Sequence, residues 1–365
     1  MRTKMRSASD SKTYMINSLI RPNLRNFAAY TSARSLYQEG LLLDANENSF
    51  GSVISSPVLN DELNRYPDPR SAKLRGALGK FLDVPEKNIF VGNGSDEIID
   101  LLIRLVVAPG ENIITVEPTY GMYKVAAETA GVKVKSCLLA LDFKVNVPEL
   151  LSLASSKSKI IFLCSPNNPT GTLVKPSEVE YICRNFKGLV VIDEAYIEFA
   201  SQPSLVKNVI SLENLVVLRT FSKAWGLAGI RVGYAVGNEV LVEYLMKIKL
   251  PYNVNRLSAQ IATDALGQTQ KMLEWRAKIL EERAKLSARL KKMGIKVFRS
   301  EANFLLVSYP NASGLAKKLA EEFGIIIRDL SSKPMLKDCI RISIGTPAQN
   351  DLLLKALNKI LWNKN

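Results

Sequence analysis

Lys223 follows an apolar run and stands in a segment rich in hydroxyl groups, Thr220-Phe221-Ser222-Lys223. A lysine at the end of a buried strand, with hydroxyls before it and Arg231 after it, suits a Schiff-base nucleophile beside an anion-binding site. A single lysine in a loop is usually just solvated. This lysine therefore indicates chemistry only together with the polar groups that the rest of the chain brings to it.

Three further segments carry polar groups at the ends of apolar runs. The sequence GNGSDE at 92–97 precedes a helical pattern, where glycines and free N–H groups favour phosphate. Asn168 lies in a turn stiffened by prolines, and Asp193 ends a run with a carboxylate, which is costly there unless it meets water, a cation or a protonated ring nitrogen. The plain alternatives are a glycine-rich turn, a proline turn and a solvated strand end. The third glycine of a dinucleotide fingerprint and the lysine of a nucleotide P-loop are missing.

The composition limits the chemistry further. The 365 residues include no histidine, which excludes Ser-His-Asp and Cys-His catalytic units and histidine-ligated metals, so a proton shuttle must be Lys, Asp, Glu, Tyr or Cys. Lys and Arg number 49 against 35 Asp and Glu, and the net charge of +14 fits ligands that are small anions or nucleic acid. The four cysteines form no CxxC motif, so we predict free thiols, a reducing, cytoplasmic location and no metal site.

Short apolar runs alternate with helical patterns along most of the chain. The runs are 89–91, 112–116, 132–138, 159–164, 189–192, 215–218 and 232–236, and the clearest helical patterns are 96–107, 120–130 and 177–185. Several runs are apolar throughout, as expected for strands covered on both faces. This order predicts an α/β fold with a mostly parallel central sheet sandwiched by helices, and ligands at the carboxyl ends of its strands.

The pattern changes after about residue 250. Residues 268–293 predict one long amphipathic helix that ends at Gly294, followed by short strands at 304–307, 325–328 and 340–344. The last helix begins with a capping box between Thr346 and Gln349. We therefore predict a large α/β domain at 48–260 and a smaller α+β domain formed by 1–47 and 261–365.

The phosphate-binding turn, the asparagine, the carboxylate and the lysine–arginine pair are together the parts needed to hold pyridoxal phosphate. The chain resembles the fold-type I pyridoxal-phosphate aminotransferases over nearly its whole length. Within them it looks like the histidinol-phosphate aminotransferase family. The narrower resemblance is carried by RNFAAY at 25–30, DANEN at 44–48, RYPD at 65–68, PTYGMY at 118–123, DEAYIEF at 193–199 and RISIGT at 341–346. Ser49 is a departure, since the family often has proline there.

The resemblance implies a role for each matching residue around the cofactor. Lys223 forms the Schiff base and moves a proton between the substrate Cα and the cofactor C4′, while Asp193 keeps the pyridine nitrogen protonated and Tyr120 stacks on the ring. Asn168 and Tyr196 bind the ring oxygen. The cofactor-binding set implied in this way is Gly94, Ser95, Asp96, Tyr120, Asn168, Asp193, Tyr196, Thr220, Ser222, Lys223 and Arg231, with Tyr66 reaching the phosphate from a second subunit.

The resemblance also implies the substrates, which are histidinol phosphate, glutamate and 2-oxoglutarate in histidine biosynthesis. Arg341 grips the α-carboxylate of glutamate by a bidentate pair. The predicted substrate-binding residues are Tyr30, Asn46, Asn48, Arg328, Arg341, Asn253 and Asn255. Which of Arg328 and Arg341 takes which anion stays open, and a plain polar loop is the alternative for the last two asparagines. A homodimer is expected, because Tyr66 completes the neighbouring site.

Other functions remain as alternatives. Within the same fold they are an aromatic amino-acid aminotransferase, an enzyme with both activities, and a decarboxylase of phosphorylated amino acids. A hydrolase is disfavoured by the lack of histidine, and a nicotinamide dehydrogenase by the incomplete glycine fingerprint. A nucleic-acid-binding regulator that uses this fold as a sensor requires a further DNA-binding domain, for which the first 45 residues or so are too short. We therefore expect neither nucleic acid nor membrane as a partner.

Overall fold

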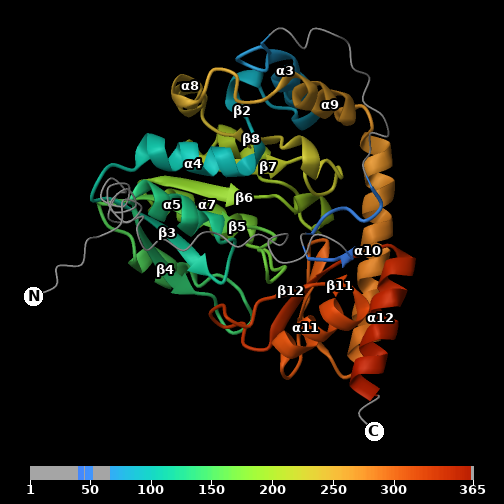
Figure 1. The fold of residues 1–365 in the computed structure, drawn as a ribbon. Coiled ribbons are helices and arrows are strands. Elements are labelled where there is room, and N and C mark those ends of the chain that lie inside the picture. Colours follow the sequence, from blue (N-terminus) through green and yellow to red (C-terminus); the bar gives the residue numbers. More distant parts are fainter. Residues whose placement is uncertain (1–39, 45, 52–65, 363–365) are drawn as a thin grey trace, which may run out of the picture.

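The computed structural model describes residues 40–44, 46–51 and 66–362 (Figure 1). Its main element is a seven-stranded sheet in the order β2-β8-β7-β6-β5-β3-β4. The strands are β2 (Ile89–Gly92), β3 (Asn112–Glu117), β4 (Lys133–Leu138), β5 (Ser158–Cys164), β6 (Leu189–Asp193), β7 (Leu215–Thr220) and β8 (Gly233–Val236). Neighbours from β4 to β7 are parallel, and β8 is antiparallel to both β2 and β7. The mostly parallel sheet is thereby confirmed.

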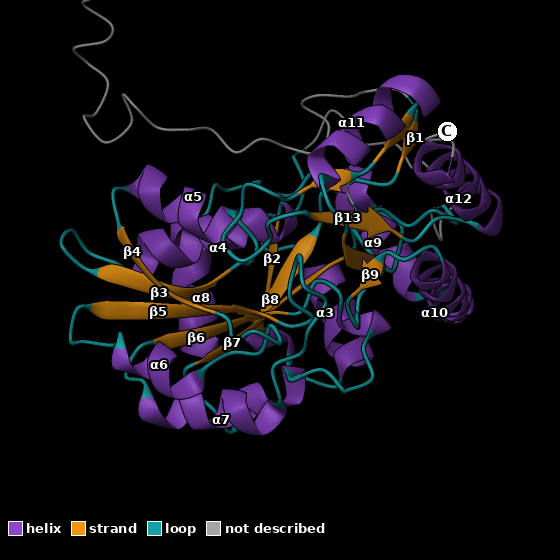
Figure 2. Ribbon diagram, turned by 90° about the horizontal axis from the view of Figure 1, so that it is seen from below, coloured by secondary structure: helices purple, strands orange, loops and turns teal. Residues whose placement is uncertain are grey.

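Helices cover both faces of this sheet, as Figure 2 shows. On one face lie α4 (Gly94–Val106) and α5 (Met122–Ala130), and on the other lie α6 (Val147–Ser152) and α7 (Pro176–Asn185). Because both faces are covered, the central strands are apolar throughout rather than alternating. In β6, Val190 and Ile192 join the core cluster that contains α7, while Val191 joins the cluster that contains α4 and α5. The central strand β6 is therefore buried on both sides, whereas the edge strand β4 is largely exposed.

A second, smaller sheet lies in the C-terminal part, in the order β12-β13-β10-β9. Its strands are β9 (Lys296–Val297), β10 (Phe304–Ser308), β12 (Arg328–Asp329) and β13 (Cys339–Ser343), accompanied by α11 (Ala312–Phe323) and α12 (Pro347–Trp362). The predicted capping box of α12 is present, with Thr346 N donating to Gln349 Oε1 (2.9 Å) and Gln349 N to Thr346 Oγ1 (3.4 Å).

The single strand predicted at 325–328 is wrong, because the chain changes sheets within it. Residues 325–326 form β11 (Ile325–Ile326), which pairs in parallel with β1 (Leu41–Leu42), whereas Arg328 and Asp329 form β12 and pair with β13. The hydrophobic pattern of a segment indicates which residues are buried but not which strand they pair with. The change of sheet between residues 326 and 328 could therefore not be predicted from the sequence. The pairing ties residues 41–42 to the C-terminal part of the chain.

The helix α10 (Thr269–Lys292) runs along both sheets (Figure 1) and ends at Gly294, as predicted. Arg276 donates to the carbonyl of Glu198, which lies in the connection between β6 and β7 of the large sheet. Arg283 donates to the carbonyl of Ala302, just before β10 of the small sheet (2.8 Å). The remaining helices are α3 (Ala72–Leu82), α8 (Glu239–Ile248) and α9 (Arg256–Leu266). Within the described residues, no helix has the length and apolarity needed to cross a bilayer. The domain division at residues 48 and 260 stays a prediction.

Candidate active site

A pocket of about 200 Å³ opens at the carboxyl ends of β5, β6 and β7. It is lined by Glu47, Ser95, Asp96, Tyr120, Cys164, Asn168, Asp193, Ala195, Tyr196, Thr220, Ser222, Lys223, Ala228 and Arg231. Most of the predicted cofactor residues are therefore brought together at one sheet edge, where open α/β sheets bind ligands. A larger groove of about 410 Å³ between α10 and α12 contains none of the predicted residues.

One end of the pocket is a cup of backbone N–H groups, hydroxyls and a guanidinium. Gly94 begins α4 with φ +77°, and a Cβ on it would lie 2.7 Å from Arg231 Nη2. A Cβ on Gly233 would lie 2.4 Å from Ser95 N, so only glycine lets β8 approach the start of α4 this closely. Thr220 Oγ1 donates to Ser222 Oγ (3.0 Å) at the cup's edge. Helix-start N–H groups beside hydroxyls and arginine form a site for a phosphate group.

Lys223 is half-buried, and its Nζ lies 5.7 Å from the centroid of the Tyr196 ring. Burial, together with the positive charges of Arg341 and Arg231, lowers the pKa of this lysine to about 8, while Glu47 and Asp96 act in the opposite direction. A lysine with such a pKa is neutral in an appreciable fraction near neutrality. It can therefore act as a nucleophile and as a base.

Asp193 ends β6 on the floor of the pocket and is 3% exposed. Its Oδ2 accepts a hydrogen bond from the Tyr123 hydroxyl (2.8 Å), and its Oδ1 accepts one from Ala195 N (3.1 Å). Burial raises the pKa of Asp193 to about 6, although both hydrogen bonds favour the ionised form. A buried carboxylate held in this way is suited to a cationic partner such as a protonated ring nitrogen.

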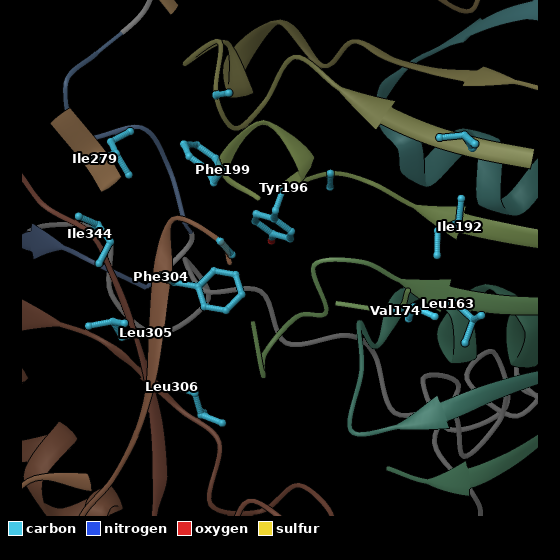
Figure 3. Packing of buried hydrophobic residues seen from close by; sticks show 14 of the residues in the cluster. Leu163, Val174, Ile192, Tyr196, Phe199, Ile279, Phe304, Leu305, Leu306 and Ile344 are labelled. Atoms are coloured by element: carbon cyan, nitrogen blue, oxygen red, sulfur yellow. The ribbon is translucent and has the colours of Figure 1, made fainter. Parts of the chain in front are cut away.

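The wall opposite the cup is a hydrogen-bonded chain that starts at Arg341 on β13. Arg341 Nη1 donates to Asn168 Oδ1 (2.5 Å) and Nη2 to the Asp44 carbonyl (2.6 Å). Asn168 Nδ2 in turn donates to the Tyr196 hydroxyl (3.4 Å). The Tyr196 ring meets Phe304 of β10 edge-on at 5.2 Å (Figure 3). The predicted anion-binding arginine is thus in direct contact with the predicted ring-oxygen residues.

Asn46 and Asn48 fasten the N-terminal segment to this wall. Asn46 has φ +54°, its Nδ2 donates to the Tyr196 hydroxyl (3.1 Å), and its N donates to Ser343 Oγ (2.8 Å). Asn48 Nδ2 donates to the Ala224 carbonyl next to Lys223 (3.0 Å). Both asparagines are buried, and neither is among the residues that line the pocket. Contact with substrate stays a prediction for them.

The remaining predicted residues lie outside the pocket lining. Arg328 stands beside Arg341 in the β12–β13 register, so both side chains project from the same face of the small sheet. Asn253 Nδ2 donates to Glu97 Oε2 (2.9 Å), while Asn255 is the N-cap of α9 and accepts from Ser258 N (2.8 Å). The side chain of Asn255 therefore caps α9, and contact with substrate stays a prediction for both asparagines.

Of two further tyrosines, Tyr66 was predicted to reach the cofactor of a second subunit and Tyr30 to bind substrate. Tyr66 is 77% exposed and stacks on Tyr252 with centroids 4.5 Å apart, away from the pocket of its own chain. Tyr30 lies outside the described residues.

Several residues of the site escaped the sequence analysis. Glu47 and Cys164 line the pocket, and Tyr123 holds Asp193. Tyr123 follows Tyr120 by one helical turn inside the PTYGMY segment, a spacing that could have suggested a second inward-facing tyrosine. Within the parts of the chain that the structure describes, no cluster of His, Cys, Asp or Glu is arranged to hold a metal ion.

A buried ion network beneath the floor was also missed. Arg219 on β7 is 7% exposed, and its Nη2 lies 2.6 Å from Glu198 Oε1. Glu194 accepts from the Ser204 hydroxyl and from Leu205 N (2.7 Å). Because side chains alternate along a strand, Glu194 and Arg219 face away from the pocket while their neighbours Asp193 and Thr220 face into it. The network thus supports the ends of β6 and β7 from below.

Comparisons with known proteins place this geometry in a family. The family model for class I and II aminotransferases matches residues 39–357. A Parabacteroides distasonis protein named histidinol-phosphate aminotransferase is 41% identical over 350 residues, covering 94% of this chain and 99% of the relative. One of the same name from Cytophaga hutchinsonii is 42% identical over 349 residues, with the same coverage.

Solved structures give the same result at the level of the fold. The crystal structure of histidinol-phosphate aminotransferase from Sinorhizobium meliloti in complex with pyridoxal-5′-phosphate superposes with a TM-score of 0.86 and 26% identity, covering 95% of this chain and 99% of that one. The enzyme of the same name from Clostridium acetobutylicum superposes with a TM-score of 0.81 and 28% identity over 88% of this chain and 99% of that one. The chain therefore belongs to the class I and II aminotransferase family.

Proposed function

We propose that this chain is a pyridoxal-phosphate-dependent aminotransferase of histidine biosynthesis. It transfers an amino group between glutamate and imidazole-acetol phosphate, giving 2-oxoglutarate and L-histidinol phosphate. The observation that carries the proposal is the convergence of Lys223, Asp193 and the phosphate cup on one pocket. It is supported by relatives about 40% identical over 94% of the chain, all named histidinol-phosphate aminotransferase.

The donors in the pocket fit the proposed cofactor at each of its functional groups. The cup formed by Gly94, Ser95 and Arg231 suits its phosphate, and the Cβ-free approach at Gly94 leaves room for close backbone contact. Asp193 suits its ring nitrogen, and the Tyr196 hydroxyl, which accepts hydrogen bonds from two amides, has its own proton left for the ring oxygen. When bound, pyridoxal phosphate supplies the electron sink that stabilises negative charge at the substrate Cα.

The residues of the chain then perform distinct tasks. Lys223 would hold the cofactor through its Nζ and, once the substrate amine has taken its place, would carry the Cα proton on that atom. Its pKa of about 8 suits both donating and accepting that proton near neutrality. Asp193 holds a proton on the ring nitrogen, and Tyr120 covers one face of the ring. No histidine is needed for any of these tasks, in agreement with the composition.

Arg341 and Arg328 receive the anionic ends of the two substrates. Histidinol phosphate carries a phosphate ester where glutamate carries its α-carboxylate, so one region must accept both anions. The two arginines lie on adjacent strands and project from the same face of the small sheet, so they supply hydrogen-bond donors for either anion. Hydrogen bonds to Asn168 and to the Asp44 carbonyl fix the orientation of the Arg341 guanidinium. Asp44 and Asn168 thus orient the guanidinium before an anion arrives.

We further propose a homodimer in which Tyr66 contacts the cofactor phosphate of the partner subunit. The support is an exposed apolar surface formed by Tyr66, Leu250 and Tyr252, which are 77%, 72% and 45% exposed. A reducing, cytoplasmic environment is proposed from the cysteines, since all four are buried, free thiols.

The test is the absorbance spectrum of the purified protein with pyridoxal phosphate, before and after L-histidinol phosphate is added without a keto acid. We expect the bound-cofactor band to shift to that of pyridoxamine phosphate in the wild type and to stay unchanged in K223A. Conversion by phenylalanine or tyrosine alone would leave the aminotransferase fold in place but assign the enzyme to aromatic amino acids. Failure of the wild type to bind the cofactor would overturn the proposal altogether.

A further inference from the structure

Tyr123 is a fully buried residue of α5 that donates a hydrogen bond directly to the pocket floor. Its side chain is 0% exposed, and its hydroxyl lies 2.8 Å from Asp193 Oδ2. The ring stacks on Phe162 of β5 with centroids 4.9 Å apart and planes 8° apart. It also meets the Tyr120 ring edge-on at 5.6 Å. Because the ring is packed on both sides in a close-packed interior, the hydroxyl cannot leave Asp193 by rotating away.

The proton of this hydroxyl is directed to the carboxylate. Burial raises the pKa of Tyr123 far above its ordinary value, so the phenol stays protonated and acts as a donor. The thiol of Cys164 is the other polar group beside it, and burial raises the pKa of that thiol as well. A neutral thiol is a weak acceptor compared with a carboxylate, so Asp193 takes the bond.

The two hydrogen bonds to Asp193 come from different parts of the fold and do different things. The bond from Ala195 N to Oδ1 belongs to the same strand end and moves with Asp193. The bond from Tyr123 comes from a helix that covers the sheet, and it fixes Oδ2 relative to that helix. With both oxygens held, the carboxylate has one orientation. Two donors also favour its ionised form against the cost of burial.

We propose that Tyr123 is a positioning residue that keeps the Asp193 carboxylate ionised and aimed at the ring nitrogen of the cofactor. The inference rests on the proposed function, since it presupposes pyridoxal phosphate in this pocket. The same side chain supports Tyr120, whose hydroxyl donates to Asp96 Oδ1 (2.9 Å) on α4. Tyr123 thus positions both Asp193, which faces the ring nitrogen, and Tyr120, which covers the ring.

The test compares the wild-type holoenzyme with Y123F, which removes only the hydroxyl. Y234F is the matched control, because Tyr234 on β8 is also buried (2% exposed) but does not donate the hydrogen bond to Asp193. The dissociation constant of pyridoxal phosphate is measured by equilibrium dialysis between pH 5 and 9. A hydrogen bond to a charged group is worth enough to expect an increase of about tenfold in Y123F at pH 7.

The pH profile separates positioning from general destabilisation. Cofactor affinity falls on acidification as Asp193 takes up a proton. The hydrogen bond from Tyr123 lowers the pKa of Asp193, so removing this bond raises that pKa and must move the fall in affinity to higher pH. Y234F keeps the wild-type midpoint. In a D193N background, Y123F adds no further loss, because the group through which it acts is already neutral.

Three outcomes contradict the inference. An unchanged pH midpoint in Y123F, even with a lowered melting temperature, assigns Tyr123 a structural role only. If the losses of cofactor affinity in Y123F and D193N add fully in the double variant, Tyr123 likewise has a structural role only. Absence of cofactor binding in the wild type removes the proposed function and this inference with it. Should Y123F fail to fold, 3-fluorotyrosine at position 123 keeps the shape of the side chain and makes its hydroxyl a stronger donor, so it is expected to move the midpoint to lower pH.

Discussion

The floor of the pocket and its substrate-facing wall are built in different ways. The floor consists of neighbouring strand ends in a single sheet, with Asp193 bonded to Ala195 two residues away and to Tyr123 from the covering helix. The wall joins segments that are far apart in the chain, since Arg341 bonds to residues 173 and 297 positions away. The difference teaches that the chemistry of the cofactor can be positioned locally, whereas the recognition of substrate depends on long-range packing.

The two regions also differ in the groups that surround their charged residues. Asp193 is almost fully buried, its carboxylate oxygens accept hydrogen bonds from Tyr123 and Ala195, and the positive charge of Lys223 lowers its pKa. Arg341 donates hydrogen bonds to an amide oxygen and to a backbone carbonyl, which are neutral acceptors. The floor is thus prepared for a cation and the wall for an anion. Damage to the floor should impair every substrate equally, and damage to the wall should discriminate among them.

The largest expected effect is at the floor, in K223A. Loss of both the nucleophile and the proton carrier should reduce kcat for every amino donor by at least about 10⁴-fold, because general acid–base catalysis alone supplies up to that factor. The measurement is single-turnover conversion of the bound cofactor by L-histidinol phosphate and by glutamate. Turnover near the wild-type rate with either donor would assign the proton transfer to another residue.

The next largest effect is at the wall, in R341Q. Removing one partner of a bidentate anion contact costs several kcal/mol, so kcat/KM for glutamate should fall by about 10²- to 10³-fold. The dissociation constant of pyridoxal phosphate should change far less. R328Q is the matched comparison, and the ratio of the two losses measured with glutamate and with histidinol phosphate assigns each arginine to its anion. Equal losses for cofactor and substrate in R341Q would contradict the division between floor and wall.

A smaller effect is expected from N46A, which leaves the charged residues intact. The variant removes the amide that bonds to Tyr196 and puts alanine at a φ of +54°. The strain and the loss of two buried hydrogen bonds, to Tyr196 and from Ser343, are expected to decrease kcat/KM by about tenfold. Steady-state kinetics on both substrates measure it. The exposed N185A serves as control, and a wild-type kcat/KM in N46A would show that the wall does not depend on this segment.

The smallest effect is the pH dependence of cofactor capture by the apo-protein. The pKa of Lys223 is lowered to about 8, so its neutral, nucleophilic form increases tenfold per pH unit below that value and levels off above it. The rate of absorbance change on mixing with pyridoxal phosphate should therefore rise from pH 6 to 8 and then plateau. In R341Q one of the charges that lower this pKa is gone, so the plateau should begin at higher pH. Identical pH profiles in the wild type and R341Q would show that the charge of Arg341 in the wall does not affect the pKa of Lys223 in the floor.

Much of the fold and of the floor could be predicted from the sequence, because the signals are local. Continuous apolar runs such as 189–192 indicated strands buried on both faces, and the polar residues that follow each run had to gather at one edge of a parallel sheet. Lys223, Asp193 and Arg231 were found in this way. Tyr123 was not, since an inward-facing tyrosine on a helix has the same pattern as any core residue.

The wall could not be predicted from pattern, because its contacts depend on which segments meet. The strand expected at 325–328 divides between two sheets, and only this division puts Arg328 beside Arg341. Asn46 bonds to Tyr196 and to Ser343, the latter 297 positions away, and no local pattern indicates either contact. The Arg219 network could not be predicted either, since one arginine in β7 and two glutamates in the connection before it give no sign that they share one buried site.

The amino-acid sequence by itself determined the class of chemistry. A chain without histidine, with a lysine after a buried strand and a phosphate-binding turn, has few other ways to move a proton and hold an anion. Tertiary structure alone decided the state of those groups. Burial brings the pKa of Asp193 to about 6 and that of Lys223 to about 8, and burial is a property of the packed molecule rather than of any segment.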